Sequence, residues 1–154
     1  MMLSDRDLRA TNEAGEFLIV PFPADHQWQP ASIDLRIAEG VDIAPGAFVL
    51  ASTLEWVRLG PSLVGRLEGK STWARRGLFV HITAGFIDPG FEGTITLELF
   101  NVSGGVLTIP AGSLISQLSL HRLSSPAERP YGHPELGSHY FGQTGTTPAV
   151  EAGQ

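Results

Sequence analysis

Glycine and proline recur at short intervals along the whole chain, and this spacing restricts the fold more than any other feature. The 154 residues include 18 glycines and 11 prolines, which separate short β-prone runs about every ten residues, as in an all-β sandwich or barrel. Hydrophobic residues make up 42% of the chain, enough for one core of ordinary size. The sequence therefore predicts an all-β fold in a single domain over residues 1–154.

Two short helices are expected among the strands. Ser4 is followed three residues later by Asp7, which is a capping-box arrangement, and Gly15 is a suitable stop for the helix that would lie between. Ser71 can cap a second helix of one or two turns, which Gly77 would end. Both helices are too short to form the core of the fold.

The remaining pattern predicts strands and then a tail. Residues 78–84, "LFVHITA", are expected to return to a strand, and residues 33–37 to form another, with Asp34 facing away from the three aliphatic side chains. From residue 124 the pattern dissolves into Gly, Pro, Ser and Thr. Residues 124–154 are therefore expected to form an extended C-terminal tail, which could become ordered on a ligand or a neighbouring subunit.

Composition excludes several classes of function. No apolar run reaches the roughly 18 to 20 residues of a membrane span, and "MMLSDRDLRA" lacks the apolar core of a signal peptide, so we expect a cytoplasmic protein with no membrane partner. The formal net charge of -6 argues against nucleic acid as a partner, because surfaces that bind nucleic acid are usually basic. The absence of cysteine removes disulfide scaffolds, thiolate nucleophiles and cysteine-ligated zinc.

Two carboxylates, Asp88 and Glu98, lie close together in "TAGFIDPGFEGTITLELFNV". In a strand over this segment, Glu98 lies on the face opposite to Ile95, Leu97 and Leu99. Glu98 is thus either a solvent-facing strand residue or a catalytic base in a pocket on that face. Asp88, which precedes Pro-Gly, belongs either to an ordinary turn or to the same site.

The segment Lys70–Arg75, "KSTWAR", is the candidate anion site. A helix N-terminus attracts anions through its free N–H groups and its dipole, and Lys70 and Arg75 add positive charge. The segment is not a Walker loop, because Gly65 lies only four positions before Gly69, one short of the required spacing. A solvated basic helix is the alternative interpretation.

The chain resembles the dCTP deaminase and dUTPase superfamily of trimeric nucleotide hydrolases along nearly its whole length. The matching segments are "MLSDRDLRA", "QPASIDLRI", "GRLEGKSTWARRGLFVHITAGFIDPGFEGTITLEL", "SPAERPYG" and "GSHYFGQTGTTP". The resemblance implies a distorted β jelly-roll with short helices, assembled as a homotrimer with active sites at the subunit interfaces. Within the superfamily the chain is most similar to the bifunctional dCTP deaminases, which form dUMP.

The resemblance also implies roles for individual residues. Glu98 matches the catalytic glutamate that activates water for attack on C4 of cytosine and passes the proton to the leaving amine. Asp88 matches the aspartate that, in dUTPases, positions the water for hydrolysis between the α- and β-phosphates. The substrate-binding residues implied are Lys70, Ser71, Thr72, Trp73, Ala74, Arg75, Ala84, Gly85, Phe86, Asp88, Thr96, Leu97, Glu98, Gln117, Tyr131, His139 and Gln143.

The implied reaction is zinc-independent deamination of dCTP coupled to hydrolysis, which gives dUMP, ammonia and diphosphate. A chain without cysteine cannot build the His and Cys zinc site of the zinc deaminases. Mg²⁺ is the implied cofactor, bound through substrate phosphates and water rather than by direct protein ligands. Gly85 and Phe86 favour the dUMP-forming type, because members that stop at dUTP tend to have His and Arg at these positions.

Some residues depart from the pattern of the deaminases. Between Arg36 and Pro45 the chain has only "IAEGVDIA", a connection as short as those of dUTPases. His139 stands where a phosphate-contacting lysine is usual, so a permanent cation is replaced by a side chain counted as neutral at pH 7. Trp73 replaces a smaller aliphatic residue in the phosphate helix, and Thr144 replaces a polar or basic residue in the tail. The alternatives are a dUTPase that acts on dUTP, a dCTP deaminase that stops at dUTP, and a non-catalytic nucleotide-binding relative.

Overall fold

A computed structural model describes residues 1–151, so residues 152–154 of the predicted tail lie outside it. The elements in chain order are α1 (Asp5–Glu13), β1 (Phe17–Val20), the 3-10 turn η1 (Asp25–Gln27), β2 (Trp28–Gln29), β3 (Ser32–Arg36), β4 (Val41–Ile43), β5 (Phe48–Leu59), β6 (Leu63–Gly69), α2 (Ser71–Ala74), β7 (Leu78–Phe79), β8 (Phe86–Ile87), β9 (Glu92–Asn101), β10 (Leu107–Ile109) and β11 (Leu114–Arg122). The all-β prediction with short helices is confirmed. No helix in residues 1–151 is long and apolar enough to cross a membrane.

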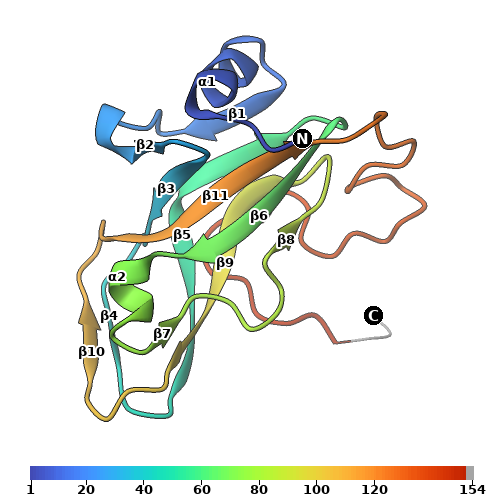
Figure 1. Cartoon of the computed structure of the whole chain (residues 1–154). Helices are drawn as coiled ribbons and strands as arrows, with labels where there is room; N and C mark the ends of the chain where they lie inside the picture. The colour runs from blue at the N-terminus through green and yellow to red at the C-terminus, as the bar shows by residue number, and fades with distance from the viewer. Residues whose placement is uncertain (152–154) are drawn as a thin grey trace.

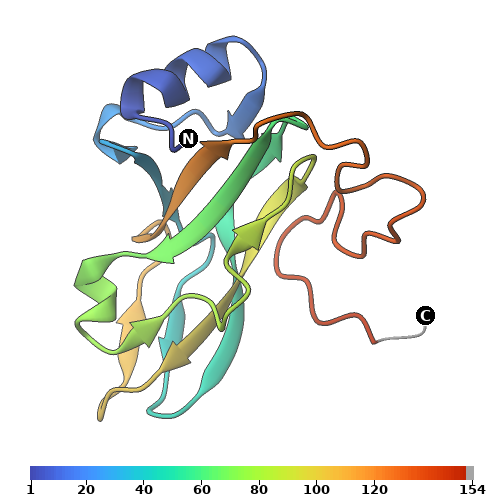
Figure 2. The same cartoon turned by 45° about the vertical axis from the view of Figure 1, so that its right-hand side comes forward.

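The strands form two main sheets that share one hydrophobic core. One sheet has the order β1-β5-β9-β7, the other β2-β3-β11-β6-β8, and β10 pairs with β4. Side chains from both sheets are fully buried in the core, among them Leu97 of β9 and Leu118 of β11. Helix α1 lies beside β1 and β2 at one end of the molecule, and the chain after β11 runs along one side of the strands (Figures 1 and 2).

Strand β9 has the alternation that the sequence predicts. Leu97 and Leu99 are fully buried, whereas Thr96 and Glu98 are only partly buried on the opposite face. The register with β5 places Glu98 opposite Leu50. An apolar face therefore fixes β9 against the core and leaves the other face open to a site.

The local predictions around α2 need correction. Lys70 is the N-cap of α2, so Ser71 is the first helical residue and not the cap. Only Leu78–Phe79 of the predicted strand 78–84 is a strand. Thr83 has φ +64°, a left-handed conformation that a β-branched residue seldom adopts, and it interrupts the extended backbone. Asp34, which was predicted to face away from the aliphatic side chains of its strand, is itself buried, with 1% of the residue exposed.

The described part of the tail has no regular structure of its own, but it is bonded to β9. No helix or strand is found between Arg122 and residue 151. The N–H of Thr94 donates to the carbonyl of Gln143 at 3.0 Å, and the side-chain amide of Gln143 donates to the carbonyl of Thr94 at 2.8 Å. Gly93 allows this approach, because a Cβ there would lie 2.7 Å from the Gln143 oxygen.

Candidate active site

Asp88 and Glu98 line one cavity with a volume of about 410 Å³. It opens beside the partly buried face of β9, and the tail covers part of it. Five other residues predicted for the substrate site line the same cavity: Ala84, Phe86, Thr96, Tyr131 and Gln143. The structure thus brings together the two carboxylates and residues from three separate segments of the chain.

A loop holds Glu98 in a fixed orientation. The backbone N–H of Ile82 donates to Oε2 of Glu98 at 2.7 Å, and the N–H of Glu98 donates to the carbonyl of Val80 at 3.1 Å. The other carboxylate oxygen, Oε1, accepts no hydrogen bond from residues 1–151. Glu98 therefore has one oxygen anchored and one available for water or substrate, which is the arrangement that a general base needs.

The carboxylate of Asp88 is free, although the residue begins a turn. The turn is closed by backbone groups: the N–H of Phe91 donates to the carbonyl of Asp88 at 3.1 Å, and Gly90 takes φ +89°. The Asp88 side chain is exposed and forms no ion pair with any described residue. The turn does not require this carboxylate, so it can serve the cavity.

The charge in this cavity is negative. Asp88 and Glu98 are its ionisable acids, and none of its described lining residues is Lys, Arg or His. A triphosphate carries several negative charges and is bound in proteins by cationic side chains and metal ions. The described lining of this cavity therefore suits a nucleobase, and it lacks the cationic side chains that a triphosphate needs.

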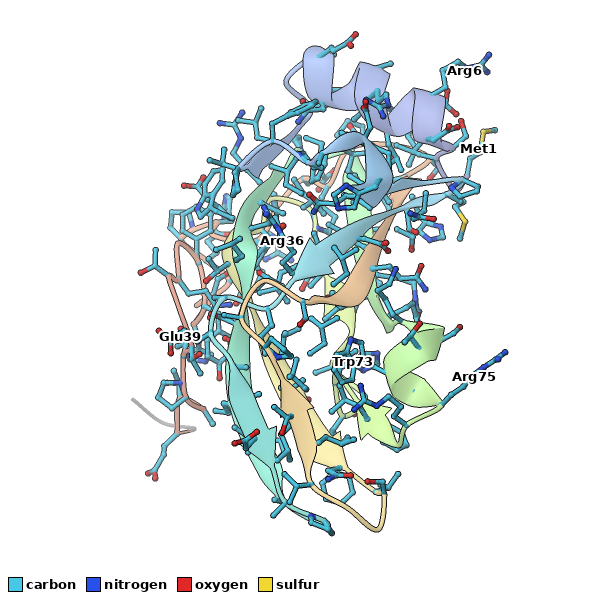
Figure 3. The ribbon with its side chains drawn as sticks, turned by 90° about the vertical axis from the view of Figure 1, so that its left-hand side faces the viewer. Met1, Arg6, Arg36, Glu39, Trp73 and Arg75 are labelled. Atoms are coloured by element: carbon cyan, nitrogen blue, oxygen red, sulfur yellow. The ribbon has the colours of Figure 1, made fainter. Side chains whose placement is uncertain are left out.

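The predicted phosphate segment lies outside the cavity. Ser71, Thr72 and Ala74 are exposed on α2 and do not line the cavity. Arg75 points outward from α2, whereas Trp73 points back towards the strands (Figure 3). The indole N–H of Trp73 donates to the carbonyl of Leu114 at 3.0 Å, so the larger side chain at this position anchors the helix.

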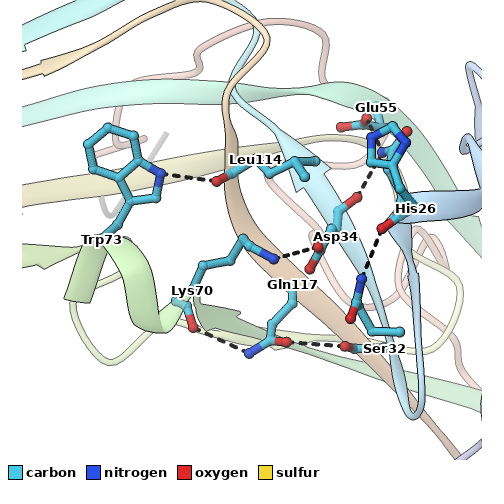
Figure 4. Close-up of polar contacts among 11 residues, drawn as sticks. His26, Ser32, Asp34, Glu55, Lys70, Trp73, Leu114 and Gln117 are labelled. Atoms are coloured by element: carbon cyan, nitrogen blue, oxygen red, sulfur yellow. Dashed lines mark hydrogen bonds and ion pairs between the residues drawn. The ribbon is translucent and has the colours of Figure 1, made fainter. Parts of the chain in front are cut away.

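Lys70 and Gln117 belong to a polar cluster behind α2. Lys70 forms an ion pair with Asp34 of β3. The amide of Gln117 donates to the carbonyl of Gly69 at 3.3 Å, and its oxygen accepts from the hydroxyl of Ser32 at 3.2 Å (Figure 4). Within one chain Gln117 thus lies beside the phosphate segment and does not line the cavity of Glu98.

The remaining predicted residues lie around the cavity. The side chain of Leu97 is fully buried in the core, so only its backbone could face a substrate. Gly85 is buried, and a Cβ there would lie 2.8 Å from the Leu67 carbonyl oxygen and 2.9 Å from Nε2 of His81. His139 lines an adjoining hollow of about 470 Å³ together with Asp88 and Tyr131.

Several lining residues were not predicted. Phe48 and Leu50 of β5, and Tyr140, Thr147 and Ala149 of the tail, also line the cavity. Leu50 lies there because it pairs with Glu98, and a strand register of this kind cannot be derived from the local pattern. Tyr140 and Thr147 fall in "GSHYFGQTGTTP", a segment that resembles the superfamily, and this resemblance is the signal that could have indicated them.

The acidic groups suit a magnesium ion that is held mainly by a substrate. Residues 1–151 contain no group of three or more His, Cys, Asp or Glu side chains that could hold a metal ion. Mg²⁺ commonly keeps several waters and binds through one or two carboxylates together with substrate phosphates. The exposed carboxylate of Asp88, which forms no ion pair within residues 1–151, fits such a site as a water-mediated contact.

Comparison with known proteins gives one consistent family. A family model described as dCTP deaminase-like matches residues 37–123. The dUMP-forming dCTP deaminase of Corynebacterium glutamicum (strain R) is 45% identical over 181 positions, which cover 97% of this chain and 95% of that protein. The protein of the same name from Mycobacterium leprae is 48% identical over equal coverage. Because this chain has 154 residues, these relatives contain residues that it lacks.

Solved structures have the same fold. The 2'-deoxycytidine 5'-triphosphate deaminase of Agrobacterium tumefaciens matches 79% of this chain and 48% of its own chain, with a TM-score of 0.68 and 18% identity. The dUTPase of EIAV matches 75% of this chain and 93% of its own, with a TM-score of 0.59 and 22% identity. These likenesses confirm the dUTPase-like β fold. Together with the family model and the relatives that align along nearly the whole sequence, they lead to one conclusion: the chain belongs to the dCTP deaminase-like family.

Proposed function

We propose that the chain is a dUMP-forming dCTP deaminase, which converts dCTP and water to dUMP, ammonia and diphosphate without zinc. One observation carries the proposal: Asp88 and Glu98 line the same cavity, so one nucleotide could meet both carboxylates. The relatives that bear this name are 45% and 48% identical to the chain. Gly85 and Phe86, which the sequence suggested as markers of the dUMP-forming type, lie beside or in that cavity.

Glu98 is proposed as the general base and acid of the deamination. Its free oxygen takes a proton from a water molecule while the water oxygen bonds to C4 of the cytosine ring and the C4–N3 double bond opens, with its electron pair moving to N3. The same oxygen then returns the proton to the 4-amino nitrogen, the C4–N bond breaks, and ammonia leaves. The N–H of Ile82, bonded to the other oxygen at 2.7 Å, keeps the carboxylate in place through both proton transfers.

Asp88 is proposed to act in the hydrolysis. Its free carboxylate orients a water molecule for attack on the α-phosphorus, and the bond to the bridging oxygen breaks to release diphosphate. Bound Mg²⁺ would neutralise charge on the phosphate oxygens. The negative cavity charge from Asp88 and Glu98 makes such neutralisation necessary before a triphosphate can approach.

A second copy of the chain is proposed to complete the site. The cavity has no cationic lining residue among those described, whereas Lys70–Arg75 lies outside it. Four large apolar side chains near the cavity are about half exposed: Phe48, Phe79, Ile82 and Phe86. An exposed apolar group of this kind marks an interaction surface. A homotrimer would cover it and bring the α2 segment of one subunit to the cavity of the next.

The chain is proposed to be a single domain whose C-terminal tail closes the active site. Tyr131, Tyr140 and Gln143 already line the cavity in the single chain, and the hydrogen bonds between Gln143 and Thr94 hold the tail on β9. A nucleotide in the cavity would therefore be enclosed between β9 and residues of the tail, which would exclude bulk water from the reaction.

A dUTPase is the second candidate. It is favoured by the short connection from Arg36 to Pro45 and by the proportions of the chain, since the alignment covers 93% of the EIAV dUTPase but only 48% of the Agrobacterium deaminase. Glu98 speaks against it, because hydrolysis of dUTP requires no base at C4 of the ring.

Product analysis separates the two candidates. Purified protein is incubated with Mg²⁺ and either dCTP or dUTP, the nucleotide products are separated by chromatography, and ammonia is assayed. A dUMP-forming deaminase yields dUMP and ammonia from dCTP in equal amounts, without accumulation of dUTP. Consumption of dUTP alone would establish the dUTPase instead, and accumulation of dUTP from dCTP would establish a deaminase that stops there.

A further inference from the structure

Helix α2, which lies within the proposed phosphate segment Lys70–Arg75, is too short to be stable by itself. Helix α2 has four residues, and its N-cap Lys70 makes no side-chain capping bond. Isolated helices need roughly 12 to 15 residues before they are even marginally stable in water. The position of α2 must therefore be imposed by groups outside the helix.

Strand β11 makes three hydrogen bonds with α2, its N-cap Lys70 and the preceding Gly69, and Figure 4 shows those of Trp73 and Gln117. The N–H of Lys70 donates to the carbonyl of Ile115 at 3.3 Å. The indole of Trp73 donates to the carbonyl of Leu114 at 3.0 Å, and the amide of Gln117 to the carbonyl of Gly69 at 3.3 Å. The register between β11 and β3 shifts between Leu114 and Ser116, which leaves carbonyl groups of this bulge available to α2.

The fourth contact is ionic and comes from β3. The ammonium of Lys70 pairs with Oδ2 of Asp34, whose side chain is 2% exposed, while that of Lys70 is 23% exposed. The other oxygen of Asp34, Oδ1, has no hydrogen-bond partner in the described structure. A nearly buried carboxylate with only one cationic partner is strongly destabilised if the partner leaves. Asp34 therefore holds Lys70 against the sheet.

Asp34 itself lies on a rigid support. The amide of Gln27 donates both to the backbone carbonyl of Asp34 at 2.9 Å and to Oε1 of Glu55 at 3.2 Å. Glu55 is fully buried and accepts from the backbone N–H and the side chain of Arg36 at 2.8 and 2.7 Å. These bonds hold β3 at the carbonyl of Asp34 and at Arg36, so the backbone that carries the Asp34 carboxylate is anchored.

We infer that Lys70 and Asp34 are positioning residues for the triphosphate segment, and that the Lys70 ammonium is not a phosphate ligand. The inference rests on the proposed function for the role of that segment. The Lys70 ammonium is directed to β3, whereas Arg75 points outward (Figure 3) and forms no ion pair in residues 1–151. Arg75 is thus the cation of the segment that is free to meet an anion.

Hydrogen exchange without nucleotide tests the positioning role directly. The N–H groups of Trp73, Ala74 and Arg75 donate to backbone carbonyls within the turn, so their exchange reports how well it is held. We expect Asp34→Asn and Lys70→Met each to increase the exchange rate of these amides at least tenfold, and Lys70→Arg to retain wild-type protection. Glu68→Gln is the matched control, because within residues 1–151 this exposed carboxylate on neighbouring β6 pairs only with Arg66, at the surface.

Steady-state kinetics separate positioning from direct binding. If the ion pair positions the segment, Asp34→Asn and Lys70→Met each raise KM for dCTP about tenfold with kcat changed less than threefold. The double variant is then no worse than either single variant, because both remove the same interaction. If Lys70 binds phosphate directly, Asp34→Asn leaves KM unchanged or lowers it by freeing the ammonium, and only Lys70→Met raises KM; that result overturns the inference.

The two assays also distinguish failure of this inference from failure of the proposed function. Exchange of the α2 amides needs no nucleotide, so it reports on the ion pair even if the wild-type protein deaminates no dCTP. Unchanged exchange in both Asp34→Asn and Lys70→Met overturns the positioning role whatever the activity. If Asp34→Asn does not fold, the comparison of Lys70→Met with Lys70→Arg decides the same question: equal exchange in these two variants overturns the positioning role.

Discussion

The backbone N–H of Ile82 donates a 2.7 Å hydrogen bond to Oε2 of Glu98, which connects the irregular loop after β7 to the middle of β9. The N–H of Glu98 returns a bond to the carbonyl of Val80. The loop and the carboxylate thus hold each other, and a change in the loop is expected to reach the site through this pair of bonds.

Glu98→Gln tests the base itself. The glutamine oxygen can still accept from the N–H of Ile82, so the fold is expected to be unchanged, but the amide cannot take a proton from water. Ammonia release from dCTP should fall at least about 100-fold, in line with the usual contribution of a general base. Circular dichroism checks the fold, and Glu68→Gln on the surface of β6 is the control. Full ammonia release from the variant would show that Glu98 is not the base.

Asp88→Asn separates the two steps. The turn is closed by the backbone of Asp88, so the variant should keep its structure. Deamination should continue while hydrolysis slows by about 100-fold or more, since misplacement of a reactant by about 1 Å can cost two orders of magnitude in rate. The expected product of dCTP is then dUTP, seen by chromatography together with ammonia. Continued release of dUMP at the wild-type rate would remove Asp88 from the mechanism.

Gly85→Ala tests whether the loop after β7, which bonds to Glu98, tolerates a side chain at this position. The added Cβ would lie 2.8 Å from the Leu67 carbonyl oxygen and 2.9 Å from His81 Nε2. The Leu67 carbonyl cannot move far, because the N–H of the same residue donates to the carbonyl of Gly85 at 2.8 Å. Overpacking of this kind costs about 1 to 3 kcal/mol. We expect a lower Tm and, because the loop carries the bond to Glu98, a loss of kcat larger than the change in KM.

Gly104→Ala is the matched control for the loop variant. A Cβ at Gly104 would meet no atom within 4 Å, and its φ is not in the left-handed region. Its Tm and kcat should therefore equal those of the wild type. If Gly85→Ala behaves like Gly104→Ala, the loop tolerates a side chain and Gly85 does not position Glu98.

The local alternation of apolar and polar residues was sufficient to predict the two faces of β9, but it was insufficient to predict all the residues that line the site. Alternation of apolar and polar residues correctly placed Glu98 opposite the side chains of Leu97 and Leu99, because a strand has a fixed period of two. The partner of Glu98 across the sheet, Leu50, depends on the register of β5, which shifts between Ser52 and Trp56. A shift of this kind is a property of the assembled sheet and leaves no local pattern.

The ion pair of Lys70 illustrates a second limit. In the sequence, Lys70 adjoins a short helix and suggests an anion site, but Asp34 lies 36 positions earlier. Only the pairing of β3 and β6 with the central β11 brings the two together. The predicted strand 78–84 is correct only for Leu78–Phe79. Thr83 adopts φ +64°, and the backbone of this loop bonds to Glu98 rather than continuing a sheet.

His139→Lys tests the tail position at which His139 stands where a phosphate-contacting lysine is usual. His139 lines the hollow that adjoins Asp88, and a lysine there would add a permanent positive charge close to the proposed phosphates. A hydrogen bond to a charged group contributes about 1 kcal/mol more than one between neutral groups, so KM for dCTP should fall about fivefold with little change in kcat. His26→Lys, at an exposed position of η1, adds the same charge elsewhere and should leave KM unchanged. Equal effects of both variants would point to long-range charge and not to a phosphate contact.

Gly93→Ala tests whether the tail must lie on β9. Gly93 has φ +145°, and a Cβ there would lie 2.7 Å from the carbonyl oxygen of Gln143. The variant should separate the tail from β9 and break the two hydrogen bonds between Gln143 and Thr94. Because Gln143 and Tyr140 line the cavity, we expect KM for dCTP to rise about tenfold or more and limited proteolysis to cut the tail faster. Gly104→Ala should change neither. A normal KM together with faster proteolysis would mean that the tail docks on β9 without contributing to the site.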